Sequence, residues 1–164
     1  MREDLVTPAM ARRLVQEGMA WEPQPGDWTT PLGAAHLNEN LIGLWLVITT
    51  HDREGYITLA DADGRWPQTR MAARDCLWLP SAGKLKVWLR ARGYRVATGE
   101  TVSRLLGGSG PSALYVCRLT RDLGPGVPAA PPIDGQGVNE AEAVASAVLQ
   151  ILGAGTADSS GPLW

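Results

Sequence analysis

The chain has 164 residues, of which 45% are hydrophobic and 20% are charged. These fractions are typical of one soluble globular domain and exclude a disordered chain. The formal net charge of −2 favours no particular class of partner. The longest apolar run, residues 41–50, is about half of the roughly 18 residues that a membrane span needs, so we expect no membrane contact. The N-terminus is acidic and lacks the pattern of a signal peptide, which predicts a cytoplasmic protein.

The first predicted helix spans residues 8–17. Thr7 suits its N-cap, and Pro8 suits the first helical position, where the missing N–H removes no helical hydrogen bond. Apolar side chains then recur at helical spacing, and Gly18 follows where a left-handed residue ends many helices. The next segment is rich in Pro and Gly, which predicts a loop with at most a short strand near Trp28.

Two strands are predicted next, and together they form a hairpin. Residues 41–50 are rich in branched and aromatic side chains, which favours a strand buried on much of both faces. Residues 55–60 form the return strand, with Ile57 and Leu59 on one face. Residues 75–79 suit a further short strand.

The second predicted helix spans residues 82–92. Ser81 is the candidate N-cap and Gly93 the stop signal. Strands are predicted over residues 94–98 and 113–120, because both segments are rich in branched and apolar side chains.

The segments between and after these strands hold the remaining elements. Residues 101–106 suit one helical turn, and residues 122–137 hold four Pro and four Gly, which predicts a long surface loop. The third helix is predicted over residues 140–152. Asn139 and Glu142 stand three residues apart at its start, as in a capping box.

These elements predict an α+β protein: a small antiparallel sheet of four or more strands with three helices, in the order α-β-β-α-β-β-α. One domain is expected over residues 1–153. Residues 154–164 are mostly small and polar and are expected to form a flexible tail.

Three segments of the sequence carry a resemblance to known proteins. They are residues 5–18, 79–94 and 139–143. In this order and with matching gaps, they resemble a class of small uncharacterised α+β proteins of phages and bacteria. The shared pattern is a helix ending in Gly, then Pro-Ser or Pro-Thr before a Trp-Leu-Arg helix, then a Glu-Ala-rich helix. The resemblance implies the order of elements and no catalytic residue.

No spacing in the sequence predicts a catalytic residue, a metal site or a cofactor. The histidines, His36 and His51, are fifteen residues apart, and no third ligand stands at metal-binding spacing. Gly107–Gly110 lacks the following helix and Lys of a phosphate-binding loop. A small enzyme remains an alternative if its site is assembled from scattered residues such as His51, Asp52 and Cys76.

Charge is distributed unevenly along the chain. Residues 1–64 carry four basic and ten acidic side chains, whereas residues 65–104 carry nine basic and two acidic ones. Aromatic side chains interleave with these cations, a combination suited to phosphate contact and base stacking. The candidate binding residues are Arg70, Arg74, Lys84, Lys86, Arg90, Trp66 and Trp78.

Two interpretations of this charge pattern remain open. In the first, basic and acidic regions pair within the molecule or across a homodimer, and the protein is a non-enzymatic interaction or accessory protein acting through self-association or a protein partner. In the second, segment 65–95 binds nucleic acid. The five cations should then lie on one exposed face, with Trp66 or Trp78 partly open to a base.

Overall fold

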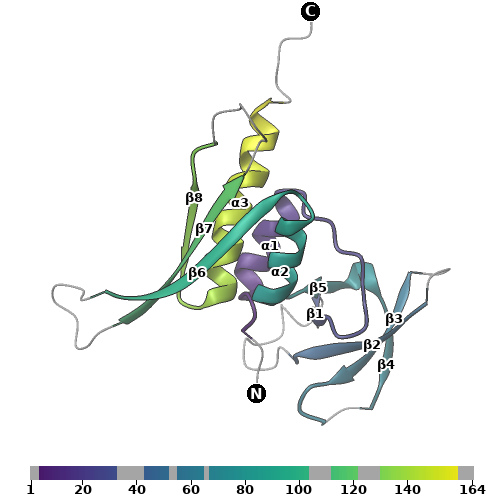
Figure 1. The fold of residues 1–164 in the computed structure, drawn as a ribbon. Coiled ribbons are helices and arrows are strands. Elements are labelled where there is room, and N and C mark those ends of the chain that lie inside the picture. The colour runs from purple at the N-terminus through teal and green to yellow at the C-terminus, as the bar shows by residue number, and fades with distance from the viewer. Residues whose placement is uncertain are drawn as a thin grey trace, which may run out of the picture. The chain divides into compact units, whose positions relative to one another are not determined.

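The structure of the chain is a computed structural model that describes residues 4–32, 43–51, 55–64, 67–103, 112–121 and 130–158. These residues form an α+β fold with three α-helices, as predicted, but the strands form two antiparallel sheets, of five and three strands, where the sequence predicted one (Figure 1). Contacts divide the chain into two compact units. We call Ala20–Pro80 the strand unit, and Met1–Met19 with Ser81–Trp164 the helical unit. The single domain expected from the sequence stays a prediction.

The strand unit holds the five-stranded sheet, in the order β4–β3–β2–β1–β5. Its strands are β1 (Trp28–Pro31), β2 (Trp45–His51), β3 (Tyr56–Asp61), β4 (Thr69–Ala72) and β5 (Cys76–Trp78). A single 3-10 turn, Ala73–Asp75, joins β4 to β5. The predicted hairpin is present as β2 and β3, and the short strands expected near Trp28 and over 75–79 are present as β1 and β5.

Burial in the core of the strand unit confirms the prediction for one strand of the hairpin and contradicts the prediction for the other. Ile57 and Leu59 are 1% and 0% exposed, so the predicted inward face of the return strand is right. The expectation that the preceding strand is buried on both faces is wrong for its described part. Of the side chains described in β2, only Val47 is buried, because β2 contributes one face to this core.

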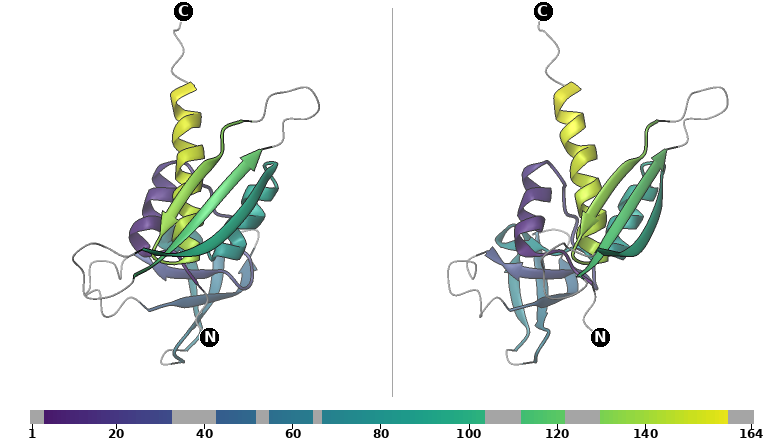
Figure 2. Two further views of the ribbon diagram at one scale, coloured as in Figure 1. Left: turned by 60° about the vertical axis from the view of Figure 1, so that its left-hand side comes forward. Right: turned by 90° about the vertical axis from the view of Figure 1, so that its left-hand side faces the viewer.

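In the helical unit, the second and third helices pack on one face of the three-stranded sheet, and the first helix packs against the third (Figure 2). The helices are α1 (Pro8–Gln16), α2 (Ala82–Arg90) and α3 (Glu140–Asp158). The strands are β6 (Tyr94–Ser103), β7 (Ser112–Arg121) and β8 (Ile133–Gly137), in the order β6–β7–β8. Helix α3 contacts β7 and β8, whereas α2 contacts β6 and α3. Among the described residues, no helix has the length and hydrophobicity needed to cross a membrane.

The predicted helix starts are confirmed by their caps. Side-chain oxygens of Thr7, Ser81 and Asn139 each accept a hydrogen bond from the backbone N–H three residues later, at 3.4, 3.3 and 2.8 Å. Helix α1 ends before Gly18, whose φ is +91°. The positive φ explains why glycine suits this position.

Three local predictions in the helical unit are wrong. Residues 101–106 were expected to form one helical turn, but residues 101–103 belong to β6, whose residues each pair with β7, and residues 104–106 lie outside the described residues. Of the predicted loop 122–137, residues 122–129 lie outside the described residues, and residues 133–137 form strand β8, which pairs with β7. Helix α3 does not stop at Gly153 but runs to Asp158, so the first five residues of the predicted tail are helical. Gly153 is not among the glycines with positive φ.

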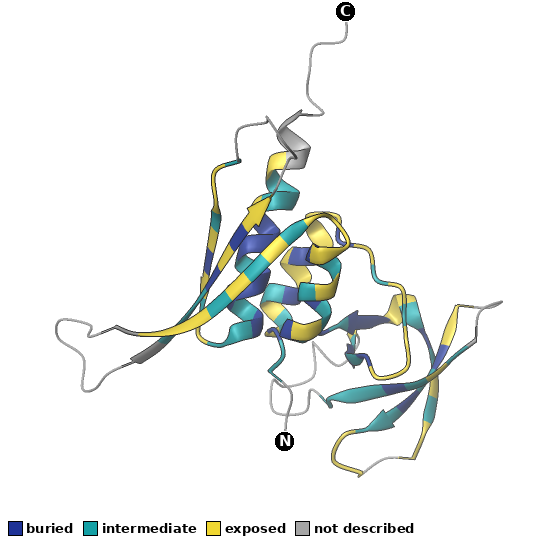
Figure 3. Ribbon diagram, viewed as in Figure 1, coloured by how far each residue is buried: buried dark blue, intermediate teal, exposed yellow. Residues whose placement is uncertain are grey.

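Strand β8 approaches α3 so closely that only glycine fits at two positions. A Cβ added to Gly135 would lie 2.6 Å from the backbone nitrogen of Ala147 and would also overlap the carbonyl oxygen of Ala143. A Cβ on Gly137 would lie 2.6 Å from the Cβ of Glu142. The small side chains of α3 and the glycines of β8 therefore allow their backbones to pack in direct contact. Figure 3 shows that the side of α3 next to the sheet is buried.

Candidate functional site

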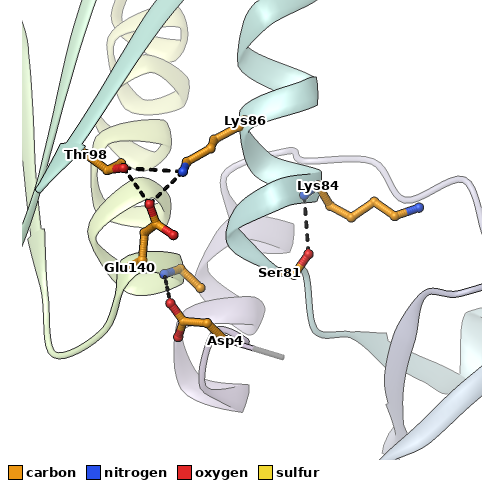
Figure 4. A network of polar contacts seen from close by, with 7 residues as sticks. Asp4, Ser81, Lys84, Lys86, Thr98 and Glu140 are labelled. Carbon is orange, nitrogen blue, oxygen red and sulfur yellow. Dashed lines mark hydrogen bonds and ion pairs between the residues drawn. The ribbon is translucent and has the colours of Figure 1, made fainter. Parts of the chain in front are cut away.

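Three polar side chains meet where α2, β6 and α3 come together (Figure 4). Lys86 Nζ lies 2.6 Å from Glu140 Oε1, and Thr98 donates its hydroxyl hydrogen to the same oxygen at 2.5 Å. The hydrogen bonds from Lys86 and Thr98 stabilise the carboxylate and lower the pKa of Glu140. Because these groups bind one another, the network is a structural connection between three elements.

The start of α3 also binds the N-terminal segment. Asp4 Oδ2 accepts a hydrogen bond from the backbone N–H of Ala141 at 3.1 Å (Figure 4), and Asn139 donates its side-chain N–H to the carbonyl of Leu5 at 3.2 Å. An acidic side chain at a helix N-terminus is favoured by the helix dipole. These polar groups therefore fix the N-terminal segment to α3.

The candidate cations lie in both units. Arg70 and Arg74 belong to the strand unit, and the other three lie on α2. Figure 4 shows Lys84 and Lys86 leaving opposite sides of α2, as a separation of two residues, roughly 200° around a helix, requires. Helix α2 therefore does not present these two lysines together, and Lys86 is bound to Glu140. The nucleic-acid surface stays a prediction.

Of the two candidate tryptophans, the structure describes only Trp78. Trp66 lies outside the described residues. Trp78 is half-buried and stacks on Trp21, with ring centroids 6.3 Å apart and an interplanar angle of 4°. This ring is therefore partly occupied by the packing of the strand unit.

Three aromatic rings of the chain lie under arginine side chains of the same molecule. The guanidinium carbon of an arginine lies 3.6 to 5.5 Å from a ring centroid in three pairs, which is cation–π geometry. The pairs are Arg70 with Tyr56, Arg92 with Trp88, and Arg121 with Tyr94.

The residues suggested for an enzyme are only partly described. Burial raises the pKa of Cys76 and of Cys117 to about 11, so both thiols are protonated near neutral pH and are poor nucleophiles. His36, Asp52 and Gly107–Gly110 lie outside the described residues, as does the side chain of His51. In the described part of the chain, no group of three or more His, Cys, Asp or Glu side chains could hold a metal ion. The enzyme alternative stays a prediction.

The helical unit has a hollow whose lining residues come from β6, β7 and β8 and from neither α2 nor α3, so it lies on the sheet face opposite these helices. Its volume is about 430 Å³. The outward side chains that line it are Ala97 and Gly99 of β6, Val116 and Arg118 of β7, and Asp134 and Gln136 of β8. Arg118 and Asp134 form two parallel hydrogen bonds of 2.7 and 2.8 Å, and this contact lowers the pKa of Asp134.

A second hollow, of about 380 Å³, lies in the strand unit. Two aromatic side chains line it, Trp21 and Tyr56, together with Glu22 and Pro23. Trp21 donates its Nε1 hydrogen to the buried carboxylate of Asp27 at 3.0 Å. The ring is therefore held in one orientation.

Sequence reasoning selected none of the residues of the first hollow and none of the second. The small residues of β6 were a usable signal, because alternating small side chains in a strand leave open space on one face. For the second hollow, the signal was a Trp-Glu-Pro run within a segment assigned as a loop. Comparison of the chain with protein-family models, with curated proteins and with solved structures found no match in any of the three.

Proposed function

We propose that this protein is a non-enzymatic interaction protein that self-associates through the outer face of the β6–β7–β8 sheet. The observation that carries the proposal is the stepped relief of this face. Gly99 pairs with Val116 and Ala97 pairs with Arg118, so each small side chain of β6 stands beside a larger one of β7. A Cβ added to Gly99 would meet no atom within 4 Å, so the space above Gly99 is open.

A stepped face is complementary to itself. If a two-fold axis runs along the strands between β6 and β7, the raised β7 side of each copy lies over the low β6 side of the other. Val116 of one copy then fills the space above Gly99 of the other, and Arg118 covers Ala97. Sheets that pack face to face by interdigitated side chains bury their apolar atoms in the same way.

The charges on this face favour a second copy over a highly charged partner. Arg118 and Asp134 are exposed, and each already binds the opposite charge. The pair adds no net charge to an interface, so it offers little attraction to a polyanion such as nucleic acid. A second copy brings the same balanced pair and therefore adds no net charge at this position.

The size of the face predicts weak, reversible association. Strands β6 and β7 each have ten residues, roughly 33 Å of strand, and two strands are roughly 10 Å wide. The flat area over which β6 and β7 of the two copies overlap is therefore roughly 330 Å², below the roughly 800 Å² per partner of a stable interface. We expect dissociation in the micromolar range or weaker.

Sedimentation equilibrium over about 5 to about 500 µM protein tests the proposal. The wild-type chain should shift from monomer to dimer over this range. Gly99→Val should remain folded, because valine favours strands and the space is open, but should weaken dimerisation at least about tenfold by filling the hollow. Val87→Ser removes an exposed apolar side chain of α2 and should leave association unchanged.

A mixing experiment tests the geometry. Equal amounts of Gly99→Cys and Val116→Cys chains should form a disulfide-linked heterodimer faster than either variant forms a homodimer, because the two positions face each other across the axis. Cys76 and Cys117 are buried and should not interfere. A monomer at every concentration, or a Gly99→Val dimer as tight as the wild type, contradicts the proposal.

A further inference from the structure

We infer that the hollow of the strand unit binds a cationic side chain, Lys or Arg, presented by an extended basic segment of another protein. This site is separate from the sheet face proposed for self-association and does not depend on it. Its lining combines a fixed aromatic ring, a second ring and one carboxylate: Trp21, Tyr56 and Glu22.

Trp21 provides a rigid aromatic surface. Its Nε1 donates to Asp27 Oδ2, and the same carboxylate oxygen accepts the backbone N–H of Gln24 at 2.9 Å. The ring also stacks on Trp78 and packs against the buried cluster around Val47. A ring that is already fixed loses little conformational entropy when a ligand binds, which favours binding.

The charge of the lining selects the sign of the ligand. Glu22 is the only ionisable carboxylate among the described lining residues, and none of these residues is Lys, Arg or His. Glu22 is exposed at the edge of the hollow. The faces of indole and phenol rings attract cations, and a nearby carboxylate adds a charge-assisted hydrogen bond. The same groups repel phosphates and carboxylates.

One of the two rings already forms a cation–π contact with an arginine of the same chain. The guanidinium carbon of Arg70 lies 4.8 Å from the centroid of the Tyr56 ring, although Arg70 does not line the hollow. Tyr56 is 38% exposed, so Arg70 covers only part of it. Trp21, which has no such cation over it among the described contacts, is therefore the main ring available to a ligand.

The remaining lining suits a short extended segment. Pro23, Ile57 and Ala73 add apolar residues to the lining, and Thr50 and Gln24 add polar ones. The hollow is within the size range of ligand pockets, at its lower end, which matches one side chain and its flanking backbone.

The test is an NMR titration of the ¹⁵N-labelled Gly99→Val chain, so that self-association does not contribute. The probes are two pentapeptides, Gly-Ser-Arg-Ser-Gly and the same peptide with citrulline, which has the shape of arginine without its charge. The arginine peptide should shift the signals of Trp21, Glu22 and Tyr56 in a saturable way. The citrulline peptide should bind about 2- to 5-fold more weakly or worse, the loss expected from one exposed cation–π contact.

Matched variants test the carboxylate. Glu22→Gln should remain folded, because Glu22 is exposed, and should reduce the preference for arginine over citrulline, because the carboxylate is lost while both rings remain. Glu17→Gln removes an exposed acid of the helical unit and should have no effect. Equal binding of the two peptides, an equal effect of Glu17→Gln, or specific shifts of the same signals by a single-stranded oligonucleotide would each overturn the inference.

Discussion

Gly135 and Gly137 allow strand β8 to lie directly against helix α3, because each has a hydrogen in place of a side chain. Both lie on the face of β8 that contacts α3, and both would overlap backbone atoms of that helix if they carried a Cβ. Neither has a positive φ, so their role is close approach and not backbone freedom. In sequence terms they looked like loop glycines, and only the neighbouring helix reveals what they do.

Gly135→Ala should therefore destabilise the protein by about 1–3 kcal/mol, the usual effect of forcing atoms into a packed interior. Urea unfolding followed by circular dichroism measures this loss. The control is Gly99→Ala, a strand glycine whose added Cβ meets nothing within 4 Å. If both substitutions lowered the free energy of unfolding equally, the close packing of β8 on α3 would not be the cause of the loss in Gly135→Ala.

At the scale of elements, the Lys86–Thr98–Glu140 network joins two helices to the edge strand β6. The pKa of Glu140 is lowered in the folded state from an ordinary value of 4.5. Its contribution to stability is thus fully present above about pH 4.5 and is lost as the pH falls through the lowered folded-state pKa. The contribution is modest, because both side chains are partly exposed.

We expect Glu140→Gln to lower the free energy of unfolding at pH 7 by up to about 1 kcal/mol. The difference between variant and wild type should shrink as the pH is lowered below the ordinary glutamate pKa. Urea unfolding at a series of pH values checks this, with Glu100→Gln, at an exposed glutamate of β6, as the control. A difference that stays constant in acid would show that the network acts through packing and not through charge.

At the scale of the whole molecule, the basic region of the sequence does not form one structural element. Two of the five candidate cations belong to the strand unit and three to α2 of the helical unit. Within α2, Lys86 binds Glu140, and Lys84 points away from it. An uneven charge along the chain is therefore no guide by itself to a charged surface.

We accordingly expect no binding of a single-stranded oligonucleotide at about 50 mM salt, measured by mobility shift and by tryptophan fluorescence. The nucleic-acid alternative makes the opposite prediction. It requires a shift whose affinity falls with salt by a log–log slope of roughly −0.7 per phosphate contact. It also requires weaker binding by the double variant Arg74→Glu with Arg90→Glu, whereas Arg12→Glu on α1 serves as the control.

The sequence alone determined the helix starts, because caps such as Thr7, Ser81 and Asn139 act on backbone groups three residues away. It also determined the α+β class from the order of the elements, and the inward face of β3 from the local alternation of apolar side chains. Tertiary structure decided the rest. Strand β8 exists because it pairs with β7 and packs on α3, although its own sequence, IDGQG, has little preference for a strand. Neither hollow was predicted from the sequence, because each is lined by residues from several segments, and their distance in space depends on strand pairing and on how the chain packs.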